Sequence, residues 1–315
     1  TVVVPRGGSG TVTVRLARSG LVGLNVRLSV PILPPGVFLT PPSFSPGVTQ
    51  GDSSTLTLRV DNAAAPGDYP LIICTTIVGD PKTRCHSART TLRVLAASAC
   101  TSPQAWYPLN GDGMDASGNG NHGTVQGATP AGNRHGDPQA ALAFDGSDDA
   151  VQLGDRFNTL TLPFSIAAWV YRSAAAGEGL RAIFVTDDEP GRYAGIWFQT
   201  DGPGQPSITF ADGGGTGAAF RRTFTASSAI PSDTWVHLTA TVRGPTDMTL
   251  YVNGAAVPGT YSGTGGPLVH TPAPARIGRI TILPANQPWL GQLDELRIYN
   301  CSLDPSGVAA LHALR

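Results

Sequence analysis

Alternation of hydrophobic and polar residues marks short strands in the first part of the chain. It is clearest in residues 11–16, 24–30 and 54–60. A period of two is typical of strands with one buried face. Prolines and glycines at 34–36 and 66–68 separate these runs. Because proline has a fixed φ and no backbone donor, these segments indicate turns or sheet edges. The pattern predicts a β-sandwich over residues 1–96.

The remainder of the chain shows about ten further short strand-like runs, a number typical of a larger sandwich or jelly roll. They lie at residues 105–109, 141–144, 150–153, 164–171, 182–186, 195–199, 207–210, 235–242, 249–252 and 291–299. Only residues 304–314 have a helical pattern, with Asp304 as a capping residue and a proline in the first turn. Small residues at 97–99 predict a linker, so a second domain is expected over residues 100–315.

Composition supports an all-β protein. The 315 residues include 39 glycines and 27 prolines without a collagen period, while 41% of the chain is hydrophobic. The net charge is −1 and only 14% of the residues are charged, which argues against a nucleic-acid or acidic-membrane partner. No stretch approaches the ~20 apolar residues that a membrane span needs. The first residues already look like a strand and not like a signal segment.

Four cysteines indicate an oxidising compartment. Cys74 with Cys85 and Cys100 with Cys301 are plausible pairs, although four cysteines allow three connectivities and the sequence does not choose among them. No CxxC occurs, which disfavours zinc. An even count in a β-rich chain predicts a secreted or surface-exposed protein.

Three short motifs in the first domain carry a family resemblance. They are VVVPRGGS at residues 2–9, LPPGV at 33–37 and APGDY at 65–69. The segment resembles the bacterial immunoglobulin-like modules of secreted hydrolases and surface proteins. Such modules usually have a further strand before the one expected at residues 1–5. We therefore expect either a longer protein or a neighbouring copy that supplies this strand, and an open sheet edge would favour strand addition.

Seven motifs in one order carry a second resemblance. They are WYPL (106–109), DASGNGNHG (115–123), FDGSDD (144–149), FSIAAWV (164–170), WVHL (235–238), LYVNG (250–254) and GQLDELRIY (291–299). The second domain resembles a laminin-G-like, concanavalin-A-like jelly roll. The resemblance implies two curved antiparallel sheets with adjacent first and last strands. This topology would bring Cys100 beside Cys301.

One loop has the spacing of a calcium ligand set. Asp115, Ser117 and Asn119 place side-chain oxygens two residues apart before a glycine. The resemblance suggests that this loop packs against the last strand, which offers Asp294 as a fourth ligand. We expect structural calcium there, and a polar turn held by side-chain hydrogen bonds is the alternative. A second acidic cluster, residues 145–149, reads as a hairpin turn because Asp-Gly between strands is a turn signal.

Catalytic patterns are missing from the sequence. The three glutamates, Glu178, Glu189 and Glu295, form no E-x-D-x-E run, so the paired carboxylates of a retaining glucanase are not supplied by one strand. No H-E-x-x-H or G-x-S-x-G motif occurs. His237 lies between two apolar residues and reads as a residue of a sheet face. A chain without catalytic activity is therefore expected.

Two tryptophans are candidates for a sugar-stacking platform. Trp197 and Trp289 lie outside the most apolar strands, whereas Trp169 and Trp235 are expected in the core. Trp197 and Trp289 could instead fill the core.

Three functions fit these patterns. The first is an extracellular binding or adhesion protein, in which a lectin-like jelly roll on an immunoglobulin-like module recognises glycan or protein. The second is a structural subunit of a surface filament that assembles through the edge of the first domain. The third is an accessory region of a longer secreted hydrolase.

Overall fold

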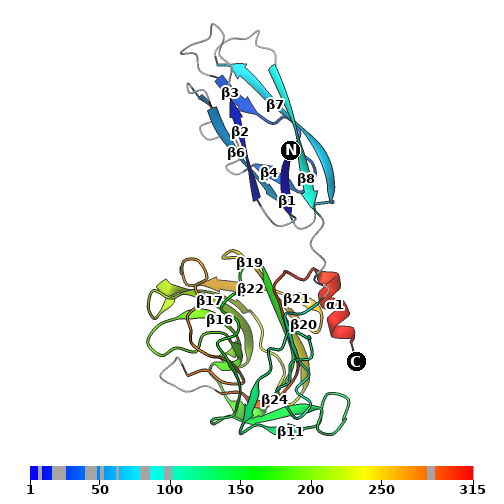
Figure 1. Cartoon of the computed structure of the whole chain (residues 1–315), viewed down its shortest axis with the longest axis vertical. Coiled ribbons are helices and arrows are strands. Elements are labelled where there is room, and N and C mark those ends of the chain that lie inside the picture. The colour runs from blue at the N-terminus through cyan, green and yellow to red at the C-terminus, as the bar shows by residue number, and fades with distance from the viewer. Residues whose placement is uncertain are drawn as a thin grey trace. The chain divides into compact units, whose positions relative to one another are not determined.

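The chain forms two compact units in a computed structural model, Thr1–Ala99 and Cys100–Arg315 (Figure 1). The structure describes residues 1–5, 9–15, 26–39, 48–49, 53–61, 64–78, 86–95, 100, 102–281 and 288–314. The predicted linker at 97–99 lies outside the described residues.

The first unit is built from two small sheets around one apolar core. The five-stranded sheet has the order β1 (Val2–Pro5), β8 (His86–Leu95), β7 (Gly67–Ile77), β3 (Val26–Ser29) and β5 (Val48–Thr49). The three-stranded sheet has the order β2 (Ser9–Arg15), β6 (Ser53–Val60) and β4 (Val37–Leu39). Val4, Leu58, Leu71 and Leu92 are fully buried between them, because alternate residues of each strand face inward. The predicted sandwich is confirmed, and its immunoglobulin-like character stays a prediction.

The strand addition predicted for this unit needs an open sheet edge, and β1 occupies one edge of the five-stranded sheet. It runs parallel to β8, with Val2 opposite Leu92 and Pro5 opposite Leu95. The chain therefore covers this edge of β8 with its own first strand. Self-association through the sheet edges of this unit stays a prediction.

The second unit contains two large antiparallel sheets. Sheet I has the order β10 (Thr124–Gln126), β13 (Ala150–Gly154), β23 (Ala275–Ile277), β15 (Arg181–Val185), β16 (Ala194–Asp201), β17 (Gln205–Asp212), β18 (Arg221–Ala226) and β22 (Gly259–Ser262). Sheet II has the order β11 (Thr129–Ala131), β12 (Ala141–Asp145), β24 (Leu290–Tyr299), β14 (Phe164–Arg172), β19 (Trp235–Gly244), β20 (Asp247–Val252) and β21 (Ala255–Val257). Two 3-10 turns, η1 (Ala174–Ala176) and η2 (Ala218–Phe220), lie in the connections.

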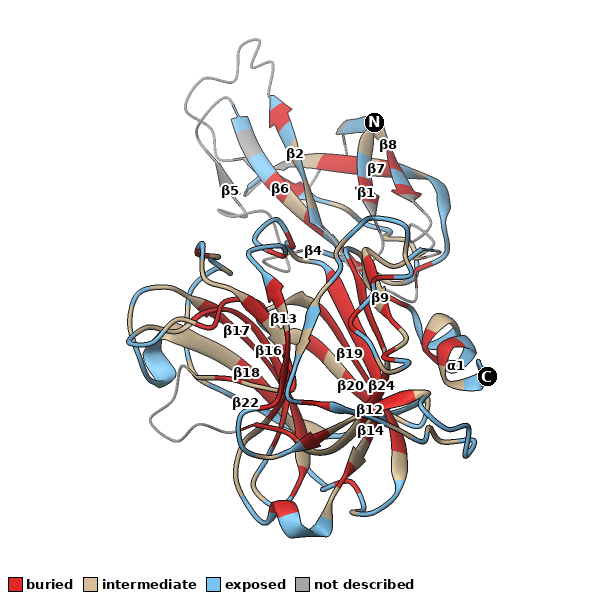
Figure 2. Ribbon diagram, turned by 60° about the horizontal axis from the view of Figure 1, so that its bottom comes forward, coloured by how far each residue is buried: buried red, intermediate tan, exposed pale blue. Residues whose placement is uncertain are grey.

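The core of this unit lies between sheets I and II, as the buried inner segments in Figure 2 show. Ile166 and Val170 of β14 and Phe198 of β16 are fully buried there. Residues between them in sequence point to the opposite face of each sheet, because side chains alternate along a strand. The all-β jelly-roll prediction is confirmed for this unit.

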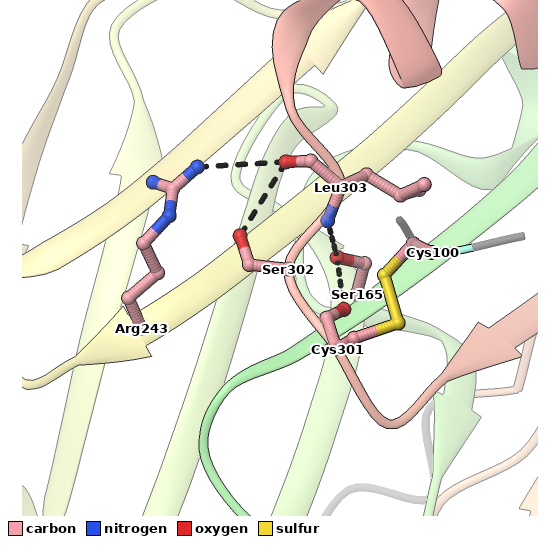
Figure 3. Close-up of a disulfide and its surroundings, with 6 residues drawn as sticks. All are labelled: Cys100, Ser165, Arg243, Cys301, Ser302 and Leu303. Carbon is pink, nitrogen blue, oxygen red and sulfur yellow. Dashed lines mark hydrogen bonds between the residues drawn. A yellow bond between two sulfur atoms is a disulfide. The ribbon is translucent and has the colours of Figure 1, made fainter. Parts of the chain in front are cut away.

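The first and last strands of the unit are neighbours, as the resemblance implied. β9 (Ala105–Tyr107) pairs with β24, with Trp106 opposite Arg297. Cys100 and Cys301 form a disulfide with a Cα–Cα distance of 5.9 Å, drawn in Figure 3. This pairing is confirmed. Cys85 lies outside the described residues, so its pairing with Cys74 stays a prediction.

A serine and the C-terminal helix complete this corner of the molecule. The Ser165 hydroxyl donates to the Cys301 carbonyl and accepts from the Leu303 amide, both at 2.9 Å (Figure 3). Helix α1 (Pro305–Ala313) follows directly, and the Asp304 carboxylate accepts the Gly307 amide at 2.8 Å. This side-chain cap and the proline in the first turn explain why the predicted helix begins where it does.

Candidate functional site

Four neighbouring strands of sheet I, β16, β17, β18 and β22, present a polar face on the side away from the core. In β16, Ile196 and Phe198 enter the core, so Trp197 and Gln199 point outward. Pairing aligns Trp197 with Thr209 of β17. Threonines and serines continue this outer row, since Thr209 is opposite Thr223 and Thr223 is opposite Ser262. Four adjacent strands thus contribute one continuous row of polar and aromatic side chains.

A pocket of about 130 Å³ lies over this row. Liquid water occupies roughly 30 Å³ per molecule, so the pocket has the room of about four waters. Its apolar wall consists of Leu180, Tyr193 and Trp197. Its polar lining consists of Gln199, Asp201, Thr209, Arg221, Thr223, Thr225 and Ser262. Trp197 is the sequence-predicted residue that the structure places in the pocket.

Two buried polar atoms of the pocket lack a protein partner. Trp197 is 3% exposed, and Gln199 is 4% exposed. The Trp197 Nε1 donor and the Gln199 Oε1 acceptor make no hydrogen bond within the described part of the protein. In contrast, the hydroxyls of Thr209 and Thr223 bond to each other at 2.8 Å. Since a buried polar group without a partner costs free energy, the pocket suits a ligand that offers both an acceptor and a donor.

The aromatic wall is a pair of rings and not an exposed indole. Tyr193 packs edge-on against Trp197 with ring centroids 4.9 Å apart. Tyr193 is half-buried, while Trp197 is buried beneath it. The ring available for stacking on a ligand is therefore that of Tyr193, and Trp197 supports it from below.

Glycine-rich loops hold two of the pocket residues in place. Tyr193 exchanges backbone hydrogen bonds with the loop at Gly213 and Gly215, both at 2.8 Å. Arg221 accepts the amide of Gly265 at 2.9 Å. A Cβ at Gly265 would press on the backbone of Arg221, so this close approach requires glycine.

One carboxylate joins the two loops. Asp212 accepts the Gly214 amide at 3.0 Å through Oδ1 and the Gly266 amide at 2.7 Å through Oδ2. The positions of Tyr193 and Arg221 are therefore coupled through Asp212. None of these three residues was predicted from the sequence, although the strand pattern of residues 221–226 was a signal for Arg221.

The laminin-G-like family described as the concanavalin A-like lectin/glucanases superfamily matches residues 145–309, which is more than half of the chain. The chain belongs to this family. The matched segment contains every strand that lines the pocket of this laminin-G-like domain. None of the curated proteins matches the chain.

Solved structures similar to the chain include carbohydrate- and receptor-binding domains. Domain 4 of AbnA, a GH43 extracellular arabinanase from Geobacillus stearothermophilus solved with arabinotriose, is 24% identical, with a TM-score of 0.48, covering 67% of this chain and 98% of its own. The binding domain of botulinum neurotoxin DC in complex with SialylT is 13% identical, with a TM-score of 0.49, covering 68% and 51%. The binding domain of Paraclostridial Mosquitocidal Protein 1 is 21% identical, with a TM-score of 0.47, covering 63% and 48%. The chain spans about half the length of the two toxin domains.

Trp289 of this laminin-G-like domain does not face solvent. Its side chain is 0% exposed in the core between the sheets, and its Nε1 donates to the Gln292 carbonyl at 3.3 Å. The prediction of Trp289 as a ligand platform is therefore wrong, because its side chain packs in the core directly before β24. Trp169 was expected in the core, but it lies on the outer face of sheet II and is half-buried. The Arg134 guanidinium lies 4.6 Å from the centre of its ring.

The loop predicted to hold calcium is held by hydrogen bonds. Oδ1 of Asp115 accepts the amides of Trp106 and Ser117, both at 2.9 Å, and Oδ2 accepts that of Asn121 at 2.8 Å. Burial raises the pKa of Asp115, but these bonds outweigh it and lower the pKa overall. Ser117 and Asn119 donate to the Gln104 carbonyl at 3.3 and 3.0 Å. These donors tie the loop to the segment before β9.

The side-chain partner of Asp294 is Arg134 and not a residue of that loop. Its carboxylate pairs with Arg134 at 2.8 Å, and both side chains are almost fully buried. Burial, together with the charge of Glu295, raises the pKa of Asp294 to about 7. Glu295 instead reaches the loop region, because it accepts the Trp106 indole at 2.9 Å. None of these contacts joins Asp294 to Asp115, Ser117 or Asn119, and calcium stays a prediction of the sequence.

The acidic cluster at 145–149 is not a hairpin turn. It connects β12 of sheet II to β13 of sheet I, so the two flanking strands belong to different sheets. Ligand atoms of Asp145, Asp148 and Asp149 lie within 4.8 Å of one another. Asp149 accepts the Asp145 amide at 2.8 Å, which shows that this carboxylate already shapes the turn.

The glutamates occupy separate places in the second unit. Glu189 pairs with Arg192 at 2.9 Å, Glu295 pairs with Arg297, and Glu178 is exposed. A retaining glycosidase needs two carboxyl groups ~5 Å apart across the sugar. These contacts give no reason to revise the expectation of a non-catalytic chain.

No helix within the described ranges is long and apolar enough to cross a membrane.

Proposed function

We propose that the second unit is a non-catalytic, extracellular glycan-binding module and that its ligand occupies the pocket over β16, β17 and β18. The observation that carries this proposal is the pair of buried, unpartnered atoms, Trp197 Nε1 and Gln199 Oε1, in a pocket lined with hydroxyls. Sugars present hydroxyl groups that both donate and accept, together with C–H faces that stack on aromatic rings. Tyr193 supplies such a ring at the rim of the same pocket.

The shape of the lining suits an oligosaccharide. The outer row crosses four strands, from Trp197 to Ser262. With neighbouring strands ~4.8 Å apart, the row extends over roughly 14 Å. A ligand that follows it would meet the indole of Trp197 on β16 and then one hydroxyl-bearing side chain on each of β17, β18 and β22, which favours an extended glycan.

An extracellular setting supports the same reading. The Cys100–Cys301 disulfide is of the kind that persists in oxidising compartments. Glycans of cell surfaces and extracellular matrices are available there as ligands, and the proposed role is adhesion to them.

The test is a glycan array followed by calorimetry with the intact chain. Trp197→Phe keeps an aromatic ring but removes the indole donor, and Gln199→Leu removes the amide acceptor at similar size. Each is expected to weaken binding of an array hit about 10-fold or more, since one lost hydrogen bond to a polar ligand costs roughly 1–2 kcal/mol.

Thr249→Val is the matched control. Thr249 lies on β20 of sheet II, outside the pocket lining. It should leave the affinity unchanged, whereas Thr209→Val in the pocket should reduce it. Array hits that bind all pocket variants with wild-type affinity would contradict the pocket assignment. An empty array would contradict glycan binding and direct the search to protein ligands.

A further inference from the structure

Arg221 brings a positive charge into the pocket without a carboxylate to balance it. Its Nη1 donates to the Thr223 hydroxyl and lies 3.4 Å from the Ser262 hydroxyl. No acidic side chain in the described parts of the chain forms an ion pair with it. Other arginines of this unit, such as Arg134 and Arg297, do have acidic partners. The guanidinium is permanently charged, so this end of the pocket carries an uncompensated cation.

The acidic residue of the pocket lining is too distant to neutralise it. The Arg221 guanidinium lies level with Thr223, because its Nη1 donates to that hydroxyl, and Thr223 is aligned through Thr209 with Trp197 of β16. Asp201 ends β16 four residues further along, which corresponds to roughly 13 Å in the strand direction. Asp201 is exposed, and its Oδ1 accepts the Gly202 amide at 2.8 Å. The pocket is therefore positive at one end and negative at the other.

Two further charged residues, Arg222 and Asp212, lie near Arg221 in the sequence and the sheet, on the face opposite to the pocket. Arg222 follows it, with its guanidinium 4.8 Å from the Tyr261 ring and hydrogen bonds to the Pro245 and Gly263 carbonyls. Asp212 is the acidic residue beside this end, and both of its carboxylate oxygens accept glycine amides. Arg222 and Asp212 carry opposite charges and do not line the pocket, so Arg221 is the cation among the lining residues that the structure describes.

We infer that the pocket selects glycans that carry a carboxylate or a sulfate, and that Arg221 binds this anionic group. The inference rests on the proposed glycan-binding function and adds the class of sugar. A guanidinium binds both oxyanions through two parallel hydrogen bonds, and Thr223 and Ser262 place hydroxyl groups beside it. The neutral part of the glycan is then held two strands away from Arg221, by Tyr193, Trp197 and Gln199.

The experiment compares matched pairs of ligands by calorimetry with the intact chain. Trigalacturonate against its methyl ester tests the carboxylate, and a sulfated galactan oligosaccharide against its desulfated form tests the sulfate. In at least one pair, we expect the acidic member to bind about 10-fold or more tightly than the neutral one. Raising the salt from 50 to 500 mM should weaken binding of the acidic member and leave that of the neutral member unchanged.

Arg221→Gln is expected to abolish this preference while neutral binding persists. Arg221→Lys should retain part of it, because the charge remains and the two-pronged geometry is lost. Arg156→Gln is the matched control, since it removes the same charge at an exposed position outside the pocket lining. It should leave the preference intact.

The outcomes separate the two proposals. Equal affinity for acidic and neutral members in both pairs, a preference that survives Arg221→Gln, or an acidic affinity insensitive to salt would overturn the role of Arg221. Glycan binding lost with Gln199→Leu would still support the proposed function in those cases. Failure of the wild-type chain to bind any of the four ligands would overturn the acidic-glycan inference, and the array would then decide the proposed function. If Arg221→Gln does not fold, the Lys variant and the salt series give the same decision.

Discussion

Replacing Cys100 and Cys301 together by serine opens a loop closed over 201 residues. In the chain-entropy model, closing a loop of that length removes about 18 cal/mol/K from the unfolded chain, or about 5 kcal/mol at 25 °C. The double variant is therefore expected to lose up to about 5 kcal/mol of the free energy of unfolding of the second unit. For a unit of this size, that corresponds to a melting temperature lower by about 10–20 °C.

Calorimetry of the wild-type chain and of the double variant measures this loss. The variant is preferable to a reducing agent, since a reductant would also act on Cys74. Serine makes few new contacts at these half-buried positions, so the comparison isolates the covalent link. The transition of the first unit should stay in place and serves as an internal control. A loss below about 1 kcal/mol would refute the entropic reasoning, because it would show that the ends already stay close in the unfolded chain.

Three further perturbations test other parts of the second unit. Gly195→Ala forces a side chain into φ +70° and against the carboxylate of Asp187, and should lower the free energy of unfolding by about 2–4 kcal/mol in urea denaturation; an unchanged midpoint would contradict this. Burial and the nearby charges of His312, Arg297 and Arg134 lower the pKa of His237 to about 3 in the folded state. Below pH 6.5 the imidazole is therefore protonated in the unfolded chain but not in the folded one, and stability falls as the pH falls. Between pH 7 and pH 5, the wild-type chain should lose about 2 kcal/mol more stability than His237→Gln, and parallel pH profiles would show that His237 does not titrate on unfolding. Asp115→Ala leaves three amides without their acceptor, so its melting temperature should fall equally in calcium and in chelator, by an amount equivalent to about 3 kcal/mol; a loss confined to calcium would instead support a bound ion.

The strands could be predicted from the sequence because alternation and turn residues are local signals. Residues 164–171 correspond to β14, and residues 235–242 lie within β19. The helix was predictable from its cap, since Asp304 accepts the Gly307 amide as expected. The laminin-G-like motifs added the topology that places Cys100 beside Cys301.

The pocket could be predicted only in part. Alternation shows that a strand has two faces but does not say which face is covered by the rest of the protein. Trp169 was therefore expected in the core although it is half-buried on the outer face, and the choice between platform and core stayed open for Trp289, which lies in the core. β18 was not identified at all, and with it Arg221 and Thr223 were missed, because their role depends on which strands are neighbours across the sheet. That information is non-local and is set by the packing of the whole unit.

The Cys100–Cys301 link has a mechanical consequence. Tension applied to the chain at Cys100 and at helix α1 passes through the disulfide, across a Cα–Cα distance of 5.9 Å. The strands between the two cysteines are outside this force path, so they are not stretched when the chain is pulled. A domain that holds a ligand while its attachment is under load would keep the shape of its pocket, and the covalent bond would bear the strain.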